Sequence, residues 1–165
     1  GEDELAYFDA VLADVTARFP VDPERILAAG FSSGGMMTWV LACRRGDSFM
    51  GFAPIAGTFW APVPETCPDG PVSLVHVHGT DDEVVPLAGR PVADTRQGDV
   101  FEAVELMRST GFGEEAIEVG YQDRRCARWR VPDGPAFLDF CRHPGGHVFS
   151  PEDVGRAYRL MAGAL

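Results

Sequence analysis

The chain has 165 residues, of which 45% are hydrophobic and 24% are charged, and this composition suits one domain with a buried core. Its net charge is −11, which argues against binding to nucleic acid or to an anionic membrane surface. All 14 basic residues are arginines, so the chain cannot use a Schiff-base lysine or a P-loop lysine. No apolar run approaches the length of a membrane span and no signal peptide is present, and the start at Gly1 leads us to expect that an upstream segment was removed or never included.

Apolar periodicity predicts helices that alternate with short buried strands, which is typical of an α/β fold with a mostly parallel sheet. The first helix is expected over residues 3–19, with an apolar stripe formed by Leu5, Phe8, Leu12, Val15 and Phe19. Further helices are expected at 35–43, at 100–108 and from Pro151 onward, and strands at 26–29, 52–56, 72–78 and 117–121. Residues 87–99 show no regular pattern and are expected to form an irregular loop. We interpret residues 1–165 as a single domain.

A hairpin is predicted near the C-terminus, turning at residues 133–134. A turn centred there places Cys126 opposite Cys141 and Arg128 opposite Asp139, while the other face of the hairpin collects apolar residues. This register predicts an ion pair and a Cys126–Cys141 disulfide, and a disulfide implies an exported, extracellular protein. The alternative is a pair of reduced, semi-buried cysteines.

The pentapeptide Gly30-Phe31-Ser32-Ser33-Gly34 lies between the strand at 26–29 and the helix that follows. A G-x-S-x-G pattern on a strand-to-helix turn is the context of a nucleophile elbow, in which Ser32 is exposed on a strained backbone. We expect a Cβ at Gly30 or Gly34 to clash within this tight turn. The alternative is coincidence, because the chain has 19 glycines.

Acidic residues and histidines follow two later strands. The strand at 72–78 leads into Asp81, Asp82 and Glu83, and spacing alone does not choose among these three acids. After the hairpin comes His147, on a loop that two preceding glycines make mobile enough to reach the elbow, with His143 as the competing candidate. The chain order of serine, acid and histidine is the order used by α/β-hydrolases. His76 and His78, which share one strand face, are interpreted as structural.

In such a triad the imidazole takes the proton of the serine, and the carboxylate holds the ring in the correct tautomer. The N–H of Ser33, at the start of the helix, is the one oxyanion donor that we place. No cofactor is needed, and no Cys/His spacing typical of a metal site appears. The candidates for substrate-pocket walls are Phe31, Phe59, Trp60 and Phe149, with core packing as the alternative for Phe59 and Trp60.

Four motifs resemble one family. They are Val-Asp-Pro-Glu-Arg-Ile at 21–26, Gly-Phe-Ser-Ser-Gly-Gly-Met-Met at 30–37, His-Gly-Thr-Asp-Asp-Glu-Val-Val-Pro at 78–86 and Gly-Gly-His at 145–147. The chain resembles the polyhydroxybutyrate depolymerase and feruloyl esterase (LpqC-like) group of α/β-hydrolases. This resemblance implies Ser32, Asp82 and His147 as the triad, a carboxylic ester as substrate (a small molecule or a polymer), and a second disulfide between Cys43 and Cys67.

The chain departs from the pattern of this family in two places. The aromatic-proline pair after the histidine is altered to Phe149-Ser150-Pro151. The N-terminal third, which in the family supplies the early strands and a second oxyanion donor, is absent, so the predicted α/β-hydrolase sheet is incomplete on that side. We therefore expect an exposed edge beside the strand at 26–29, covered by a second copy or by a partner chain. The alternative to an active esterase is a catalytically incomplete remnant.

Overall fold

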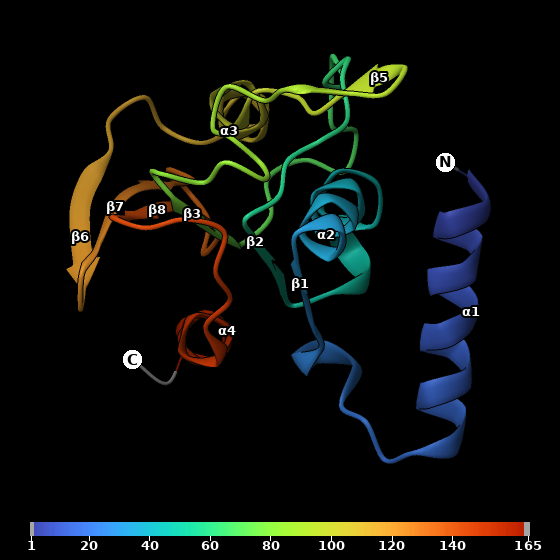
Figure 1. Cartoon of the computed structure of the whole chain (residues 1–165). Coiled ribbons are helices and arrows are strands. Elements are labelled where there is room, and N and C mark those ends of the chain that lie inside the picture. Colours follow the sequence, from blue (N-terminus) through green and yellow to red (C-terminus); the bar gives the residue numbers. More distant parts are fainter. Residues whose placement is uncertain (1, 164–165) are drawn as a thin grey trace.

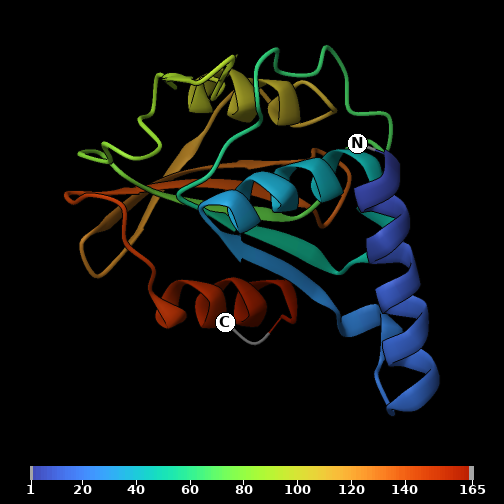
Figure 2. The same ribbon diagram turned by 45° about the vertical axis from the view of Figure 1, so that its right-hand side comes forward.

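The computed structural model describes residues 2–163, which form a six-stranded sheet with helices on both faces (Figures 1 and 2). The strand order is β1-β2-β3-β8-β7-β6. Strands β1, β2, β3 and β8 are parallel, and β7 and β6 extend the sheet as antiparallel neighbours. The expected mostly parallel sheet with a C-terminal hairpin is therefore confirmed.

The elements lie close to their predicted positions. The helices are α1 (Glu2–Arg18), α2 (Ser33–Arg44), α3 (Val100–Arg108) and α4 (Pro151–Met161), with 3-10 turns at Pro23–Arg25 and Gly46–Ser48. The sheet contains β1 (Leu27–Phe31), β2 (Gly51–Ile55), β3 (Leu74–Gly79), β6 (Ile117–Tyr121), β7 (Arg124–Arg130) and β8 (Phe137–His143). The irregular loop expected at 87–99 is wrong in one respect, because it contains a short ribbon of β4 (Pro91–Val92) and β5 (Thr95–Arg96). Strands of two residues are too short to show an alternating pattern.

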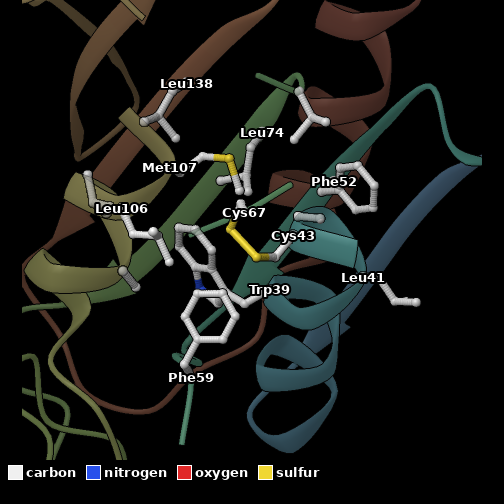
Figure 3. Packing of buried hydrophobic residues seen from close by; sticks show 14 of the residues in the cluster. Trp39, Leu41, Cys43, Phe52, Phe59, Cys67, Leu74, Leu106, Met107 and Leu138 are labelled. Carbon is white, nitrogen blue, oxygen red and sulfur yellow. A yellow bond between two sulfur atoms is a disulfide. The ribbon is translucent and has the colours of Figure 1, made fainter. Parts of the chain in front are cut away.

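Two layers of apolar side chains hold the helices on the sheet. Helices α2 and α3 cover one face, where Trp39 and Met107 pack against Leu74 and Leu138 (Figure 3). Helix α4 covers the opposite face, where Ala157 belongs to a separate buried cluster. Both faces of the central strands are buried because parallel strands are covered by helices on either side. None of the helices within residues 2–163 is long and apolar enough to span a bilayer.

Helix α1 lies at the side of the sheet, next to α2 and the edge strand β1 (Figure 1). Of its predicted apolar stripe only Leu5 is buried, whereas Phe8, Leu12 and Val15 are half-buried. Phe19 lies past the end of the helix and is 58% exposed, so its predicted packing was wrong. Two further apolar residues of this helix, Tyr7 and Val11, are also exposed.

The predicted hairpin register is confirmed residue by residue. Cys126 pairs with Cys141 and Arg128 with Asp139 across β7 and β8. The first pair is a disulfide, and Cys43 and Cys67 form a second disulfide that lies in the core beside Trp39 (Figure 3). Arg128 and Asp139 form a bidentate ion pair, with both N–O distances at 2.6 Å. The hairpin is therefore tied together by a covalent bond and by a buried ion pair.

Both disulfides lead to a simple chemical prediction. Because each of the four cysteines is bonded, iodoacetamide should add nothing to the protein when it is unfolded without a reductant. Reduction before alkylation should add four carbamidomethyl groups, which intact-mass spectrometry counts. Peptide mapping that finds alkylated Cys126 and Cys141 in the unreduced sample would contradict the cross-strand disulfide.

Candidate active site

Ser32 occupies the turn between β1 and α2 in a backbone conformation that non-glycine residues rarely adopt. Its φ is 57° and its ψ is −118°. Conformations of this kind cost on the order of 1–3 kcal/mol and persist only where the surroundings hold them. Here the Ser32 N–H donates to the Ile55 carbonyl and the Ser32 carbonyl accepts from the Met36 N–H, both at 2.9 Å. The strained serine is thus held from β2 on one side and from the first turn of α2 on the other.

The sequence singled out two glycines in the elbow, and a side chain would clash at only one of them. A Cβ on Gly30 would lie 2.2 Å from the Gly34 carbonyl oxygen, so this position requires glycine. A Cβ on Gly34 would meet nothing within 4 Å, and the predicted clash there was wrong. Gly34 faces an apolar groove of about 300 Å³ between α1 and the edge strand β1. The close approach on the helix side falls instead at Gly35, whose Cβ would lie 2.6 Å from the Ile55 carbonyl oxygen.

Asp82 and His147 meet at the carboxyl edge of the sheet. The Nδ1 atom of His147 lies 2.7 Å from Oδ2 of Asp82, and the Asp82 side chain is completely buried. The other carboxylate oxygen accepts two backbone N–H groups, from Val84 at 2.9 Å and from Val85 at 2.8 Å. Because a carboxylate only accepts, Nδ1 of His147 carries the proton and Nε2 is the nitrogen free to act as a base. The competing acids, Asp81 and Glu83, are exposed.

The loops that carry Asp82 and His147 are joined through their backbones. The Thr80 N–H donates to the His143 carbonyl and the Asp81 N–H donates to the Gly145 carbonyl, each at 2.9 Å. Gly79 makes this contact feasible, because a Cβ there would lie 2.2 Å from the Gly145 carbonyl oxygen. Sequence reasoning missed Gly79, although its place at the end of a strand before the acidic loop was a usable signal. His143, the competing histidine, is buried at the end of β8.

Aromatic residues place the imidazole of His147 next to the elbow. The ring of Phe31, the residue before Ser32, lies 4.6 Å from the His147 ring, and Phe149 lies 5.8 Å from Phe31. The His147 side chain remains 15% exposed. The structure therefore brings Asp82 and His147 together and places the His147 ring against Phe31, the residue that precedes Ser32 on the β1–α2 turn.

The four candidate wall residues lie in three different surroundings. Trp60 is 44% exposed and lines a pocket of about 250 Å³ together with Glu4, Ser33 and three residues of α2 that the sequence pattern placed on the inner side of the helix, Met36, Met37 and Val40. Phe31 contacts the His147 ring, and Phe149 contacts Phe31. Phe59 is 3% exposed and packs 5.7 Å from Trp39 (Figure 3), so the packing alternative describes it.

The N-terminus of α2 supplies a backbone N–H group, that of Ser33, which lines the pocket described above. Ser33 is the first residue of α2, so its N–H has no partner within the helix and carries part of the positive end of the helix dipole. A negatively charged oxygen next to Ser32 would be stabilised there. Within residues 2–163 no group of three or more histidine, cysteine or acidic side chains is arranged to hold a metal ion.

Comparisons with known proteins show the family to which the chain belongs. A family model described as phospholipase/carboxylesterase matches residues 6–123. The chain belongs to the phospholipase/carboxylesterase family. It is 38% identical over 90 residues to the putative esterase NocK of Nocardia uniformis subsp. tsuyamanensis, over 54% of this chain and 26% of that protein. It is also 30% identical over 166 residues to feruloyl esterase C of Emericella nidulans, over 94% of this chain and 53% of that protein.

Solved structures show the same fold as this member of the phospholipase/carboxylesterase family. Arabidopsis thaliana SOBER1 superposes with a TM-score of 0.56 at 17% identity, over 99% of this chain and 61% of that one. The fold is that of an α/β-hydrolase. The chain spans about half the length of feruloyl esterase C and about a quarter of NocK.

The two elbow glycines make a matched pair for mutation. Gly30→Ala should destabilise the protein by about 1–3 kcal/mol or more, because its Cβ is driven into the backbone of α2. Gly34→Ala should change the free energy of unfolding by less than about 1 kcal/mol, because its Cβ enters open space and alanine favours a helix. Urea denaturation followed by circular dichroism measures both values. Equal destabilisation by the two substitutions would show that the space around Gly34 is filled.

Proposed function

We propose that the chain is the catalytic part of a serine esterase that hydrolyses carboxylic esters. The observation that carries this proposal is the Asp82–His147 pair at 2.7 Å, whose imidazole contacts Phe31, the residue before the strained Ser32. Membership of the phospholipase/carboxylesterase family supports ester hydrolysis as the reaction class. Because the chain spans only part of its relatives, its own activity is part of the proposal.

The proposed reaction has two steps. In the first, Oγ of Ser32 attacks the ester carbonyl while Nε2 of His147 takes the hydroxyl proton, and Asp82 stabilises the imidazolium that forms. The Ser33 N–H stabilises the oxyanion of the tetrahedral intermediate. The bond to the alkoxy oxygen then breaks, and His147 gives its proton to the departing alcohol. In the second step His147 takes a proton from a water molecule, which attacks the acyl carbon. The bond to Oγ of Ser32 then breaks, His147 returns the proton to Oγ, and the acid is released.

The pocket beside the elbow favours an ester with an apolar or aromatic acyl group. Trp60, Met36, Met37 and Val40 form an apolar wall next to Ser33, with Glu4 as the acidic residue of the pocket. Phe31 contacts the proposed catalytic histidine, and Phe149 contacts Phe31. Several relatives are named feruloyl esterase, and a feruloyl ester has an aromatic acid of this kind. A feruloyl ester is our first choice of substrate, and an oligomer of a polyester such as polyhydroxybutyrate is the second. Two disulfides support export as the proposed location.

A second candidate function is supported by the open side of the sheet. Within the described residues β1 pairs only with β2, and an apolar groove lies along it. On this alternative the chain is a catalytically incomplete remnant, or it needs further strands, a second copy or a partner chain to cover the edge and supply a second oxyanion donor. The loss of one such donor costs about 2.7–4 kcal/mol of transition-state stabilisation, which is about 10²–10³ in kcat.

Labelling with a fluorophosphonate probe tests the proposal directly. The probe phosphonylates an activated serine and releases fluoride, so wild type should gain one adduct by intact mass. Ser32→Ala should gain none, whereas Ser33→Ala keeps its backbone N–H and should still be labelled. Asp82→Asn should slow labelling and p-nitrophenyl butyrate turnover by about 10⁴-fold, because His147 then favours the wrong tautomer.

The outcomes separate the two candidate functions. A single adduct that only Ser32→Ala abolishes would support the esterase. A folded, monodisperse protein that gains no adduct would contradict the esterase and favour the incomplete remnant. An adduct that persists in Ser32→Ala would contradict the assignment of the nucleophile.

A further inference from the structure

Two histidines beneath Asp82 form a buried chain of polar contacts. His76 and His78 are adjacent on one face of β3, and both are completely buried. Nδ1 of His76 lies 3.0 Å from the Pro54 carbonyl oxygen, and its Nε2 lies 3.0 Å from Nδ1 of His78. Nε2 of His78 lies 2.8 Å from the Val85 carbonyl oxygen and 3.4 Å from Oδ2 of Asp82. This row of polar contacts therefore runs from β2, through the two imidazoles, to the loop that carries Asp82.

Two neutral imidazoles do not have enough protons for these contacts. A carbonyl oxygen only accepts, so Nδ1 of His76 and Nε2 of His78 must both donate. Each neutral ring has a single N–H, and both are used by these two contacts. Nε2 of His76 and Nδ1 of His78 would then face each other at 3.0 Å with a lone pair on each and no proton between them, which is repulsive. Any other neutral arrangement turns an unprotonated nitrogen toward the carbonyl of Pro54 or Val85. Three protons satisfy all three contacts, and the pair then carries one positive charge.

The charges around Asp82 also point to one positive charge on the His76–His78 pair. The structure has two other buried aspartates, and each is paired with arginine: Asp139 with Arg128 and Arg156, and Asp153 with Arg124. The side-chain partners described for Asp82 are both histidines, His147 and His78. Burying a carboxylate is costly unless it is both hydrogen-bonded and paired with a charge. Asp82 has three N–H donors but no arginine among the partners described for it. If the charge lay on His147, this ring could not take the proton of Ser32.

The surroundings of the pair partly offset the cost of burying a charge. The ring of His76 lies between Trp39, at 5.2 Å, and Phe140, which is stacked on it at 5.7 Å, and aromatic faces attract cations at such distances. Burial lowers the pKa of His76 well below 6.5, with the charge of His78 as a smaller cause in the same direction. Because the pair takes up only one additional proton, a single charge has to be desolvated.

His78 is the member of the pair that meets other charged groups. Burial is the largest effect on it and lowers its pKa, while the Val85 carbonyl and the Asp82 charge raise its pKa. His147 and His143 act in the lowering direction when they are charged. If His147 is neutral, one of these opposing effects is removed. The groups that face the pair from α2, β2 and β8 are the uncharged Trp39, the Pro54 carbonyl and Phe140.

We propose that His76 and His78 share one additional proton, and that this buried positive charge is the counter-ion of Asp82. The pair does not border the substrate pocket, so the two histidines are positioning residues. They hold the Asp82 loop through Val85 and keep His147 neutral in the resting enzyme. The proton count rests on the contacts alone, whereas the role of His147 rests on the proposed esterase function.

Nuclear magnetic resonance of ¹⁵N-histidine-labelled protein at pH 7 tests the proton count without requiring activity. The chain has four histidines, and the single variants His143→Gln and His147→Gln identify the signals of the other two. With a shared proton, the pair should show one unprotonated ring nitrogen, or two nitrogens with shifts midway between the protonated and unprotonated values. Two fully unprotonated nitrogens in the pair would overturn the proposal.

A second measurement tests the effect on His147. His76→Leu removes the shared charge but keeps the contact of His78 with Val85, so the balancing proton should move to His147. A larger fraction of His147 should then carry protons on both nitrogens at pH 7, and fluorophosphonate labelling should slow about tenfold, because the loss of a nearby positive charge favours the charged imidazole. Labelling should recover as the pH is raised toward 9. Val77→Ala, a buried change on the opposite face of β3, is the matched control and should leave His147 with one proton.

The two measurements distinguish this proposal from the esterase proposal. If wild type is not labelled at all, the esterase function fails, but the resonances still count the protons on the pair. If His76→Leu leaves His147 with one proton and labels at the wild-type rate, the counter-ion role is overturned. A slow rate in His76→Leu that does not recover at high pH would indicate a purely structural role and would also overturn it.

Discussion

The buried carboxylate of Asp82 is the group on which the architecture of the candidate site depends. It sits at the end of β3 with its side chain fully buried, and it is bonded by two backbone N–H groups of its own loop and by His147. A charge in this position is tolerated only if its donors are all in place, because desolvation is costly. The turn over residues 82–85, the loop after β8 and the histidines beneath the carboxylate are therefore constrained together. Displacement of any one of them would leave a buried charge without a partner.

The sheet is closed to different degrees at its two ends. On the side of β8 the hairpin of β7 and β6 extends the sheet, and it is held by the Cys126–Cys141 disulfide and by the ion pair of Arg128 with Asp139. On the other side β1 carries the elbow but has a neighbour only in β2 within the described residues. Ser32, the proposed nucleophile, thus directly follows the strand that has a single neighbour within the described residues. This placement connects the two candidate functions, because Ser33, the proposed oxyanion donor, begins the helix that packs next to that strand.

Several expectations from the sequence failed for one common reason. The predicted clash at Gly34, the packing of Phe19 and the role of Phe59 as a pocket wall all depended on what lies across from the residue. Spacing along a chain shows which residues share a face, but it does not show whether another layer covers that face. Gly34 borders the apolar groove beside β1, Phe19 is exposed just after the end of α1, and Phe59 packs in the core against Trp39. By contrast, the hairpin register was predictable because one turn position determines every cross-strand pair.

The sequence by itself determined the local chemistry: a strand-turn-helix with Ser32 at its turn, a hairpin whose register pairs the cysteines, and a chain order of serine, acid and histidine. These features depend on neighbours in the chain and on the turn residues between them, so pattern and spacing are sufficient. Tertiary structure decided which of three adjacent acids meets the histidine, because only the pleat of β3 and the turn after it bury Asp82 and expose Asp81 and Glu83. It also decided that His76 and His78 contact one another and end beneath that carboxylate. Protonation of such a pair depends on burial and on the partners at both ends, and both are products of the folded packing.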